Sequence, residues 1–221
     1  MFLGVLGHDL RGPLNAILMT SQVMARLVSA EPLMEHTTRL LRSGERMRRL
    51  LDDLLDYSRV SLGVGTNIHR SSVDLVAACR KELDMLRSAL PDHALLFEVE
   101  GNPKGEFDAF RIREALSNLV HNAASHGAPG LPIHVRLEGN DDAVNLSAEN
   151  MGQAISEETS AAMFEPLSRG RIEDGEPTDR SHLGLGLFVV REIAKAHGGT
   201  VTGTCSDGKT TFRVTLGRSK P

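Results

Sequence analysis

Apolar side chains recur at steps of three and four residues through the first 57 positions, which is the spacing of one helical face. In a first helix, expected from residue 1 to about residue 28, this stripe consists of Leu3, Leu6, Leu10, Leu14 and Ile17. A turn at residues 29–32 leads into a second helix that ends near Tyr57 and carries Leu40, Met47, Leu51 and Leu54 in a coiled-coil spacing. Two helices with one stripe each bury little apolar surface alone, so we expect a homodimer that forms a four-helix bundle.

His8 lies off this stripe. It falls midway between Leu6 and Leu10 in sequence, so at about 100° per residue it points away from the apolar face and toward solvent. Asp9 follows it directly. An exposed imidazole beside a carboxylate can accept a group that a partner delivers. Taken alone, a solvated surface histidine is the simpler interpretation of the same residues.

The composition fits one or two soluble domains. The chain has 221 residues, of which 40% are hydrophobic, and a formal net charge of −4. This charge gives no electrostatic reason to expect binding to nucleic acid or to an anionic membrane surface. Cys79 and Cys205 lie far apart without metal-ligand spacing, so we expect free thiols in a reducing compartment. No apolar run approaches the roughly 18–20 residues that cross a bilayer. We therefore expect a cytoplasmic chain, with any membrane-bound or sensory part in segments outside it.

Beyond residue 62 the pattern changes from paired helices to a mixture of helices and strands. Gly63 and Gly65 lie in a segment of linker composition. Helices are expected at residues 73–90, 108–125 and 184–197, and strands at residues 94–100, 133–137, 143–148, 200–205 and 211–216. We therefore predict an α+β chain with an N-terminal two-helix hairpin (residues 1–62), a linker (63–70) and an α/β sandwich (71–221).

One of the predicted helices carries a polar stripe. Glu114, Asn118 and Asn122 are spaced four residues apart and therefore share a face, while their apolar neighbours can pack against a sheet. Carboxylate and amide oxygens suit Mg²⁺, a hard cation that keeps some of its waters and bridges phosphates. An ordinary surface helix with polar residues facing outward would show the same pattern.

Two glycine-bearing segments suit a nucleotide. At Asn150 and Gly152, after a predicted strand, an amide oxygen can accept a hydrogen bond from an adenine amino group, and the glycine lets the base approach the backbone. Gly184 and Gly186 open a predicted helix, where free backbone amides can bind phosphate oxygens. The long loop before them (residues 166–183) carries basic side chains that can cover a triphosphate, and we expect a mobile lid. Each segment alone is equally explained by an ordinary turn.

In this order and at these intervals, five segments resemble the motifs of two-component sensor histidine kinases. They are the H box at residues 8–14, the N box at 118–123, the G1 box at 150–155, the F box at 163–167 and the G2 box at 184–187. The resemblance covers nearly all of the chain. It implies a dimerisation and histidine-phosphotransfer bundle joined to an ATP-binding domain of the Bergerat type.

The resemblance also implies roles for individual residues. His8 would take the γ-phosphoryl group of ATP, helped by Asp9, and pass it to an aspartate of a response regulator that docks near His8. Glu114 and Asn118 would be catalytic, and Asn122 would hold Mg²⁺. The nucleotide-binding residues implied by the motifs are Asn122, His126, Asn150, Gly152, Ile155, Phe164, Gly184, Leu185, Gly186 and Leu187.

Four positions depart from the family pattern. Asn150 stands where the G1 box normally begins with aspartate, Ala154 replaces its second glycine, and Ser125 stands where a lysine or arginine often contacts phosphate. We expect these changes to weaken nucleotide binding without abolishing it. Gly12 replaces a threonine or asparagine that orients a water for dephosphorylation of the regulator, so we expect weak or absent phosphatase activity.

The departures keep a second hypothesis open: a phosphotransfer or scaffolding protein with a degenerate nucleotide site and no kinase activity. It would retain the bundle and the regulator-docking face. An ATPase unrelated to signalling is a more distant alternative, because it would not need a bundle containing His8. Only seven residues precede His8, about two helical turns, so we expect the chain to be the core of a longer protein.

Overall fold

The computed structural model describes residues 12–13, 15–17, 19–20, 23, 36, 38–40, 43–44, 47, 68–152, 162–166 and 184–218. The chain divides into two compact units, and each is described by itself. In the N-terminal unit every described residue is α-helical, as the apolar spacing predicts for this part of the chain. His8 and Asp9 lie outside the described residues.

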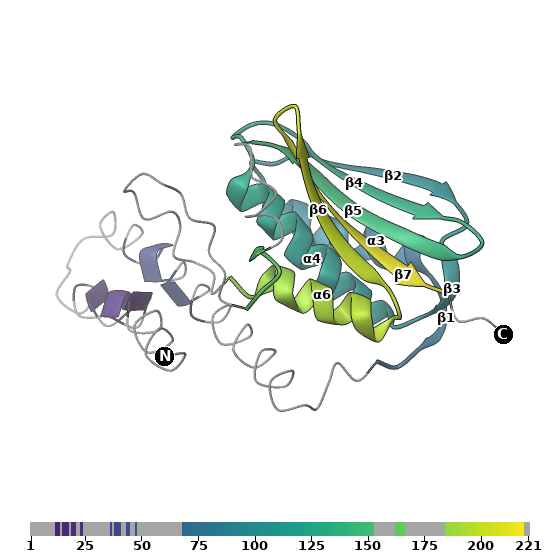
Figure 1. Cartoon of the computed structure of the whole chain (residues 1–221). Coiled ribbons are helices and arrows are strands. Elements are labelled where there is room, and N and C mark those ends of the chain that lie inside the picture. The colour runs from purple at the N-terminus through teal and green to yellow at the C-terminus, as the bar shows by residue number, and fades with distance from the viewer. Residues whose placement is uncertain are drawn as a thin grey trace. The chain divides into compact units, whose positions relative to one another are not determined.

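The C-terminal unit is built on a mixed five-stranded sheet (Figure 1). Its order is β2 (Leu95–Gly101), β4 (Ile133–Gly139), β5 (Ala143–Met151), β7 (Lys209–Gly217) and β6 (Thr200–Ser206). Strands β2 and β4 are parallel, and the other neighbouring pairs are antiparallel. A separate antiparallel pair is formed by β1 (Ser71–Asp74) and β3 (Lys104–Phe107).

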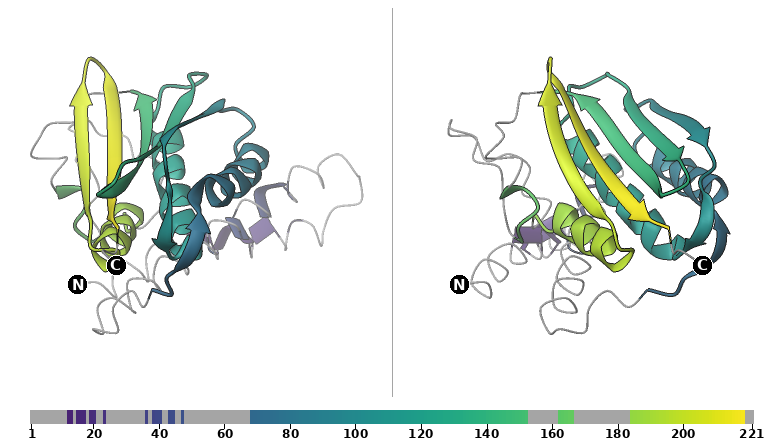
Figure 2. Two further views of the ribbon diagram at one scale, coloured as in Figure 1. Left: turned by 90° about the vertical axis from the view of Figure 1, so that its right-hand side faces the viewer. Right: turned by 45° about the vertical axis from the view of Figure 1, so that its right-hand side comes forward.

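Three helices cover one face of this sheet, as Figure 2 shows. They are α3 (Leu75–Ala89), α4 (Ala109–His126) and α6 (Gly186–Ala196). Helix α4 packs on β4 and β5, α6 packs on β6 and β7, and α4 also contacts both other helices. The predicted α/β sandwich is thus confirmed. No helix in the described part of the chain is both long enough and apolar enough to span a bilayer.

The strand residues that point toward the helices are apolar and buried. The strand register places Leu146 opposite Leu137 on one side and opposite Val214 on the other, and all three are fully buried. Alternate residues of the same strands are polar and lie on the opposite face. Because side chains alternate between faces along a strand, this pattern is the signal by which β4, β5 and β7 are recognised in the sequence.

Aspartate caps fix where α3 and α4 begin. The Asp74 carboxylate accepts the backbone N–H of Val76 at 2.9 Å, and the Asp108 carboxylate caps α4 in the same way. The first helix of this unit therefore starts at Leu75, and the predicted start at residue 73 is wrong because Val73 pairs with Gly105 in β1–β3. These two short strands were not predicted, since four residues without strict apolar alternation carry almost no period-two signal.

Two other predicted boundaries are corrected. Strand β5 continues through Met151, so Asn150 lies within the strand and not after it. Helix α6 begins at Gly186 because Gly184 has φ of +72°, a left-handed conformation that cannot belong to a right-handed helix. It ends at Ala196, with His197 as its C-cap.

The two cysteines are free thiols, as predicted from their spacing. Cys79 is fully buried on α3, and burial, with a smaller contribution from nearby Glu82, raises the pKa of its thiol to about 12. The thiol is therefore protonated and unreactive at neutral pH. Cys79 is a core residue of this unit.

Candidate functional site

The polar stripe predicted on the second helix of the sandwich lies on α4, opposite its core-facing side. The side that faces the core is apolar and buried, through Ile112, Ala115, Leu116, Leu119, Val120 and Ala123. Glu114, Asn118 and Asn122 are half-buried on the other side. Within the described part of the chain, the side-chain amides of Asn118 and Asn122 have no hydrogen-bond partner. They are therefore available to a ligand.

Glu114 differs from the two asparagines because it has a partner. Its carboxylate forms an ion pair with the Arg111 guanidinium at 2.7 Å, and both side chains are only 19% exposed. Arg111 lies one turn earlier on the same helix, so the pair is set by helical geometry. Within the stripe, the amides of Asn118 and Asn122 thus have no hydrogen-bond partner among the described residues, whereas this carboxylate has one.

The glycine-opened helix α6 meets the stripe at Asn118. A Cβ placed on Gly186 would lie 3.2 Å from Asn118 Oδ1, so the backbone of α6 passes directly beside that amide. The N-cap residue of α6, Leu185, makes no side-chain hydrogen bond to the first turn of the helix. The N-terminal amides of such a helix suit phosphate oxygens. The structure therefore brings together the N-box and G2-box segments.

Leu185 and Leu187 contribute to this site only through their backbone. Leu185 is fully buried and Leu187 is 6% exposed, so both side chains belong to the core of the unit. Gly184, at φ +72°, turns the chain into the helix just before them. In the four G2-box residues, the backbone is thus the part that a ligand can contact, and the two buried leucine side chains hold this backbone in place.

Asn150 lies at a second meeting point, near the end of β5. Its side chain is 4% exposed, and its amide nitrogen makes only a 3.5 Å contact with the Met151 carbonyl. Thr210 of β7 pairs directly with Asn150 across the sheet and is also buried. Thr210 was not singled out from the sequence; its place beside Asn150 depends on the β5–β7 register, which residue spacing does not reveal.

Gly152 is required by a close backbone approach. A Cβ at this position would lie 2.6 Å from the carbonyl oxygen of His126, and Gly152 forms an isolated bridge with Gly127. The C-terminal end of α4 and the end of β5 are joined here, and the N–H of Ala128 donates to the Met151 carbonyl at 2.7 Å. His126, at the last turn of α4, is exposed beside this junction.

Phe164 is placed in the core. Its ring is 7% exposed and stands edge-on to Phe212 of β7, with centroids 5.9 Å apart. Glu165 next to it pairs with Arg191 of α6 at 2.6 Å, and that hydrogen bond lowers the pKa of the carboxyl. These contacts fasten residues 162–166 to β7 and α6. The remaining G1-box residue of the predicted set, Ile155, lies outside the described residues.

The donor set fits a magnesium ion that is bound together with a phosphate ligand. Among the described residues no three His, Cys, Asp or Glu side chains gather into a metal cluster. Among the described residues the amide oxygen of Asn122 has no partner, and the first turn of α6 offers backbone amides of the kind that can bind phosphate. A hard cation that keeps several waters needs few protein ligands when phosphates supply the rest.

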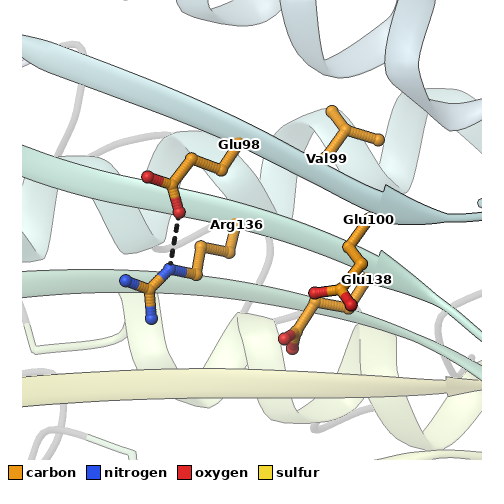
Figure 3. Close-up of a pocket in the computed structure, with 5 residues that line it drawn as sticks. All are labelled: Glu98, Val99, Glu100, Arg136 and Glu138. Atoms are coloured by element: carbon orange, nitrogen blue, oxygen red, sulfur yellow. Dashed lines mark hydrogen bonds and ion pairs between the residues drawn. The ribbon is translucent and has the colours of Figure 1, made fainter.

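A separate hollow lies on the polar face of the sheet, which the helices do not cover (Figure 3). It is lined by Glu98, Val99, Glu100, Arg136 and Glu138, from β2 and β4. Arg136 and Glu98 pair at 3.0 Å across these strands. Carboxylates outnumber the single guanidinium here, so this hollow does not suit a nucleotide triphosphate.

A mixed sheet covered on one face by helices, with a polar α4 stripe meeting a glycine-opened helix, defines a nucleotide-binding class of domain. Comparison with known families agrees. The family described as histidine kinase-, DNA gyrase B- and HSP90-like ATPase matches residues 107–220, and the His Kinase A (phospho-acceptor) domain matches residues 1–63. The chain belongs to this ATPase family and forms the catalytic core of a sensor histidine kinase.

Curated relatives match almost the whole chain. A bacteriophytochrome of Pseudomonas aeruginosa is 32% identical over 97% of this chain and 29% of its own length. A probable sensor histidine kinase, TcrY, of Mycobacterium tuberculosis is 30% identical over 97% of this chain and 45% of its own length. The chain thus spans less than half the length of these relatives.

Solved structures share the fold at lower identity. The histidine kinase AdeS of Acinetobacter baumannii superposes with a TM-score of 0.73 at 23% identity, over 96% of this chain and 98% of that one. The histidine kinase ThkA, solved in complex with the response regulator protein TrrA, gives a TM-score of 0.73 at 21% identity, over 99% of this chain and 61% of that one.

Proposed function

We propose that this chain phosphorylates itself on His8 from ATP and then supplies the phosphoryl group to an aspartate of a response regulator. The observation that carries the proposal is the contact between Gly186 and Asn118. It brings two motifs from distant parts of the sequence into contact. Phosphate-binding amides and the unpartnered amides of α4 are the groups that a magnesium-bound triphosphate requires.

Within this proposal the described residues bind and orient the nucleotide. The amide of Asn122 holds Mg²⁺, and the backbone of residues 184–187 holds the phosphates. When bound, the ion neutralises charge on the phosphate oxygens. Asn150 and Thr210, buried side by side on β5 and β7, receive the adenine. The Asn150 amide oxygen accepts from the adenine amino group but lacks the charge of a carboxylate, which gives a weaker site.

The chemical step is an in-line displacement at the γ-phosphorus. A ring nitrogen of His8 forms the new P–N bond, the bond to the bridging oxygen breaks, and ADP leaves. Asp9 accepts a hydrogen bond from the other ring nitrogen and raises the nucleophilicity of the imidazole. The phosphoryl group then passes to a carboxylate of the regulator, which docks on a homodimeric bundle near His8.

Incubation with γ-labelled ATP and Mg²⁺ tests this function directly. We expect acid-labile, base-stable label on the wild-type chain, no label on His8→Ala, and strongly reduced label on Asn122→Ala. Lys81→Ala, an exposed change on α3, serves as the control and should label normally. Label that survives His8→Ala would contradict the proposal. Absence of both label and nucleotide binding in the wild type would favour the scaffolding alternative.

A further inference from the structure

A buried aspartate and a buried histidine join helices α4 and α6 at the end of the two helices opposite to Gly186. Asp108 is the N-cap of α4 and is 7% exposed, while His197 is the C-cap of α6 and is fully buried. The backbone N–H of Asp108 donates to His197 Nε2 at 3.1 Å. The start of one helix is thus hydrogen-bonded to the end of the other, and Figure 1 shows the two helices side by side.

The hydrogen bonds fix the protonation state of this imidazole. Nδ1 lies 2.8 Å from the Ile193 carbonyl oxygen, which can only accept, so Nδ1 carries a proton. Nε2 accepts from the Asp108 N–H, so Nε2 carries none. A second proton would abolish the acceptor at Nε2. The arrangement therefore requires a neutral ring.

The same pair holds the chain where it enters this unit. The Asp108 carboxylate accepts the backbone N–H groups of Phe110 and Arg111 at its own helix, and that of His69 at 2.8 Å. Arg70, the next residue, donates to the Ala196 carbonyl at the end of α6 at 3.4 Å. Two consecutive residues are thus bonded to α4 and α6 respectively.

Both helices lead from this pair to the proposed nucleotide site. Helix α6 has 11 residues, about 16 Å at 1.5 Å per residue, and its other end is Gly186 beside Asn118. A shift of α6 along α4 at His197 would therefore be carried to the phosphate-binding amides. Close-packed protein interiors have low compressibility and transmit such a strain.

We propose that Asp108 and His197 are positioning residues of the nucleotide site, which set the register of α6 against α4 and thereby the distance between the α6 amides and Asn118. This inference rests on the proposed function, because it assigns the pair to the nucleotide site. Neither residue touches the nucleotide. They act through the two helices that they join.

Two replacements of His197 separate the two hydrogen bonds. In His197→Gln the terminal amide lies where Nε2 was and can accept from Asp108, whereas in His197→Asn the shorter side chain reaches only the Ile193 carbonyl. We expect His197→Asn to weaken the binding of a fluorescent Mg–ATP analogue about tenfold, because a buried N–H loses its acceptor. His197→Gln should restore most of that loss. Lys195→Ala, an exposed change on the same turn, is the matched control.

A pH profile distinguishes positioning from general support of the fold. The charged groups that face His197 are Asp108 on α4 and Arg70 before β1. As the pH is lowered from 7.5 to well below 6.5, so that it passes the lowered pKa of His197, wild-type affinity should fall more steeply than that of His197→Gln, because glutamine cannot take up a proton. Titration of the nucleotide affects both proteins alike. This comparison also stands if His197→Asn does not fold.

The outcomes are distinguishable. If the wild type binds nucleotide and a folded His197→Asn binds equally well, or if wild type and His197→Gln have parallel pH profiles, the inference is overturned while the proposed function stands. If the wild type binds no nucleotide at any pH, the proposed function is wrong, and this inference, which rests on it, is wrong as well.

Discussion

At the scale of single residues, the site combines groups held rigidly by the core with groups left without partners. Leu185 and Phe164 are buried, so they fix the backbone around them. Asn118 and Asn122 have no hydrogen-bond partner among the described residues, so their half-buried amides are available to a ligand. The proposed nucleotide site thus has a backbone held by buried side chains and amides that a ligand can reach.

Asn150 is the residue whose identity departs most from the family pattern. We expect Asn150→Asp to tighten nucleotide binding by about fivefold, since a carboxylate accepts more strongly than an amide oxygen from the adenine amino group. The same change should lower the melting temperature of the free protein, because the side chain is 4% exposed and the new charge is buried. Titration calorimetry and thermal unfolding measure the two effects. Weaker binding with unchanged stability would contradict both.

Gly12 offers a test of phosphatase activity. It is helical and exposed, and a Cβ placed on it would meet no heavy atom of the described residues within 4 Å, so these residues leave room for a side chain. We expect Gly12→Thr to accelerate loss of phosphate from a phosphorylated receiver domain in the presence of ADP by at least about tenfold, because the hydroxyl can orient a water. Gly12→Ala, which adds a methyl group but no hydroxyl, should leave the slow rate unchanged. Equal rates of phosphate loss with the Gly12→Thr and Gly12→Ala variants would contradict this explanation.

At the scale of elements, helix ends decide both the boundaries and the electrostatics of this unit. Burial by itself raises the pKa of Asp108, but hydrogen bonds from the backbone amides of His69, Arg111 and Phe110, together with the charge of Arg111, outweigh it, so the pKa is lowered. The carboxylate is therefore ionised at neutral pH and stabilises the N-terminus of α4. Its ionised form is what the cap requires.

His197, at the end of α6, makes stability depend on pH. Burial lowers the pKa of this imidazole below its ordinary 6.5, although the hydrogen bond to Ile193 opposes the shift. As the pH falls below about 6.5 the unfolded chain takes up a proton that the folded chain does not, so the free energy of unfolding decreases through that range and is fully retained above it. Urea unfolding at pH 7.5 and 5.5 measures this. The decrease should be smaller in His197→Gln, and equal decreases would contradict the assignment.

At the scale of the whole molecule, the type of most elements could be predicted from the sequence, but which elements pair or pack with one another could not. The apolar alternation of β4 and the periodicity of α4 are local properties of the chain, and the structure contains both. The short strands β1 and β3 were missed because their pairing, Val73 with Gly105 for example, joins segments separated by α3. The domain limits at residues 62 and 70 and the roles of the motif residues remain predictions.

Close contacts between segments that are distant in the sequence could not be predicted from the sequence either. A Cβ on Gly139 would collide with the Asn102 carbonyl oxygen. The Arg218 guanidinium donates to the carbonyls of Asn102, Lys104 and Asn140. These contacts join the turns at one end of the sheet to the C-terminal end of β7. The residues next to Gly139 and Arg218 in the sequence do not predict these contacts, because the partners come close only when the chain is folded.

The sequence by itself determined which residues can be helical, which can be buried, and which five motifs occur in order, because propensity, periodicity and motif spacing are properties of nearby residues. Only the tertiary structure decided that Asn118 lies beside Gly186, that Thr210 lies beside Asn150 and that His197 accepts from Asp108. The physical reason is that strand register and helix packing are selected by burial of the whole core at once, so the contacts that complete a site depend on residues far from it in sequence.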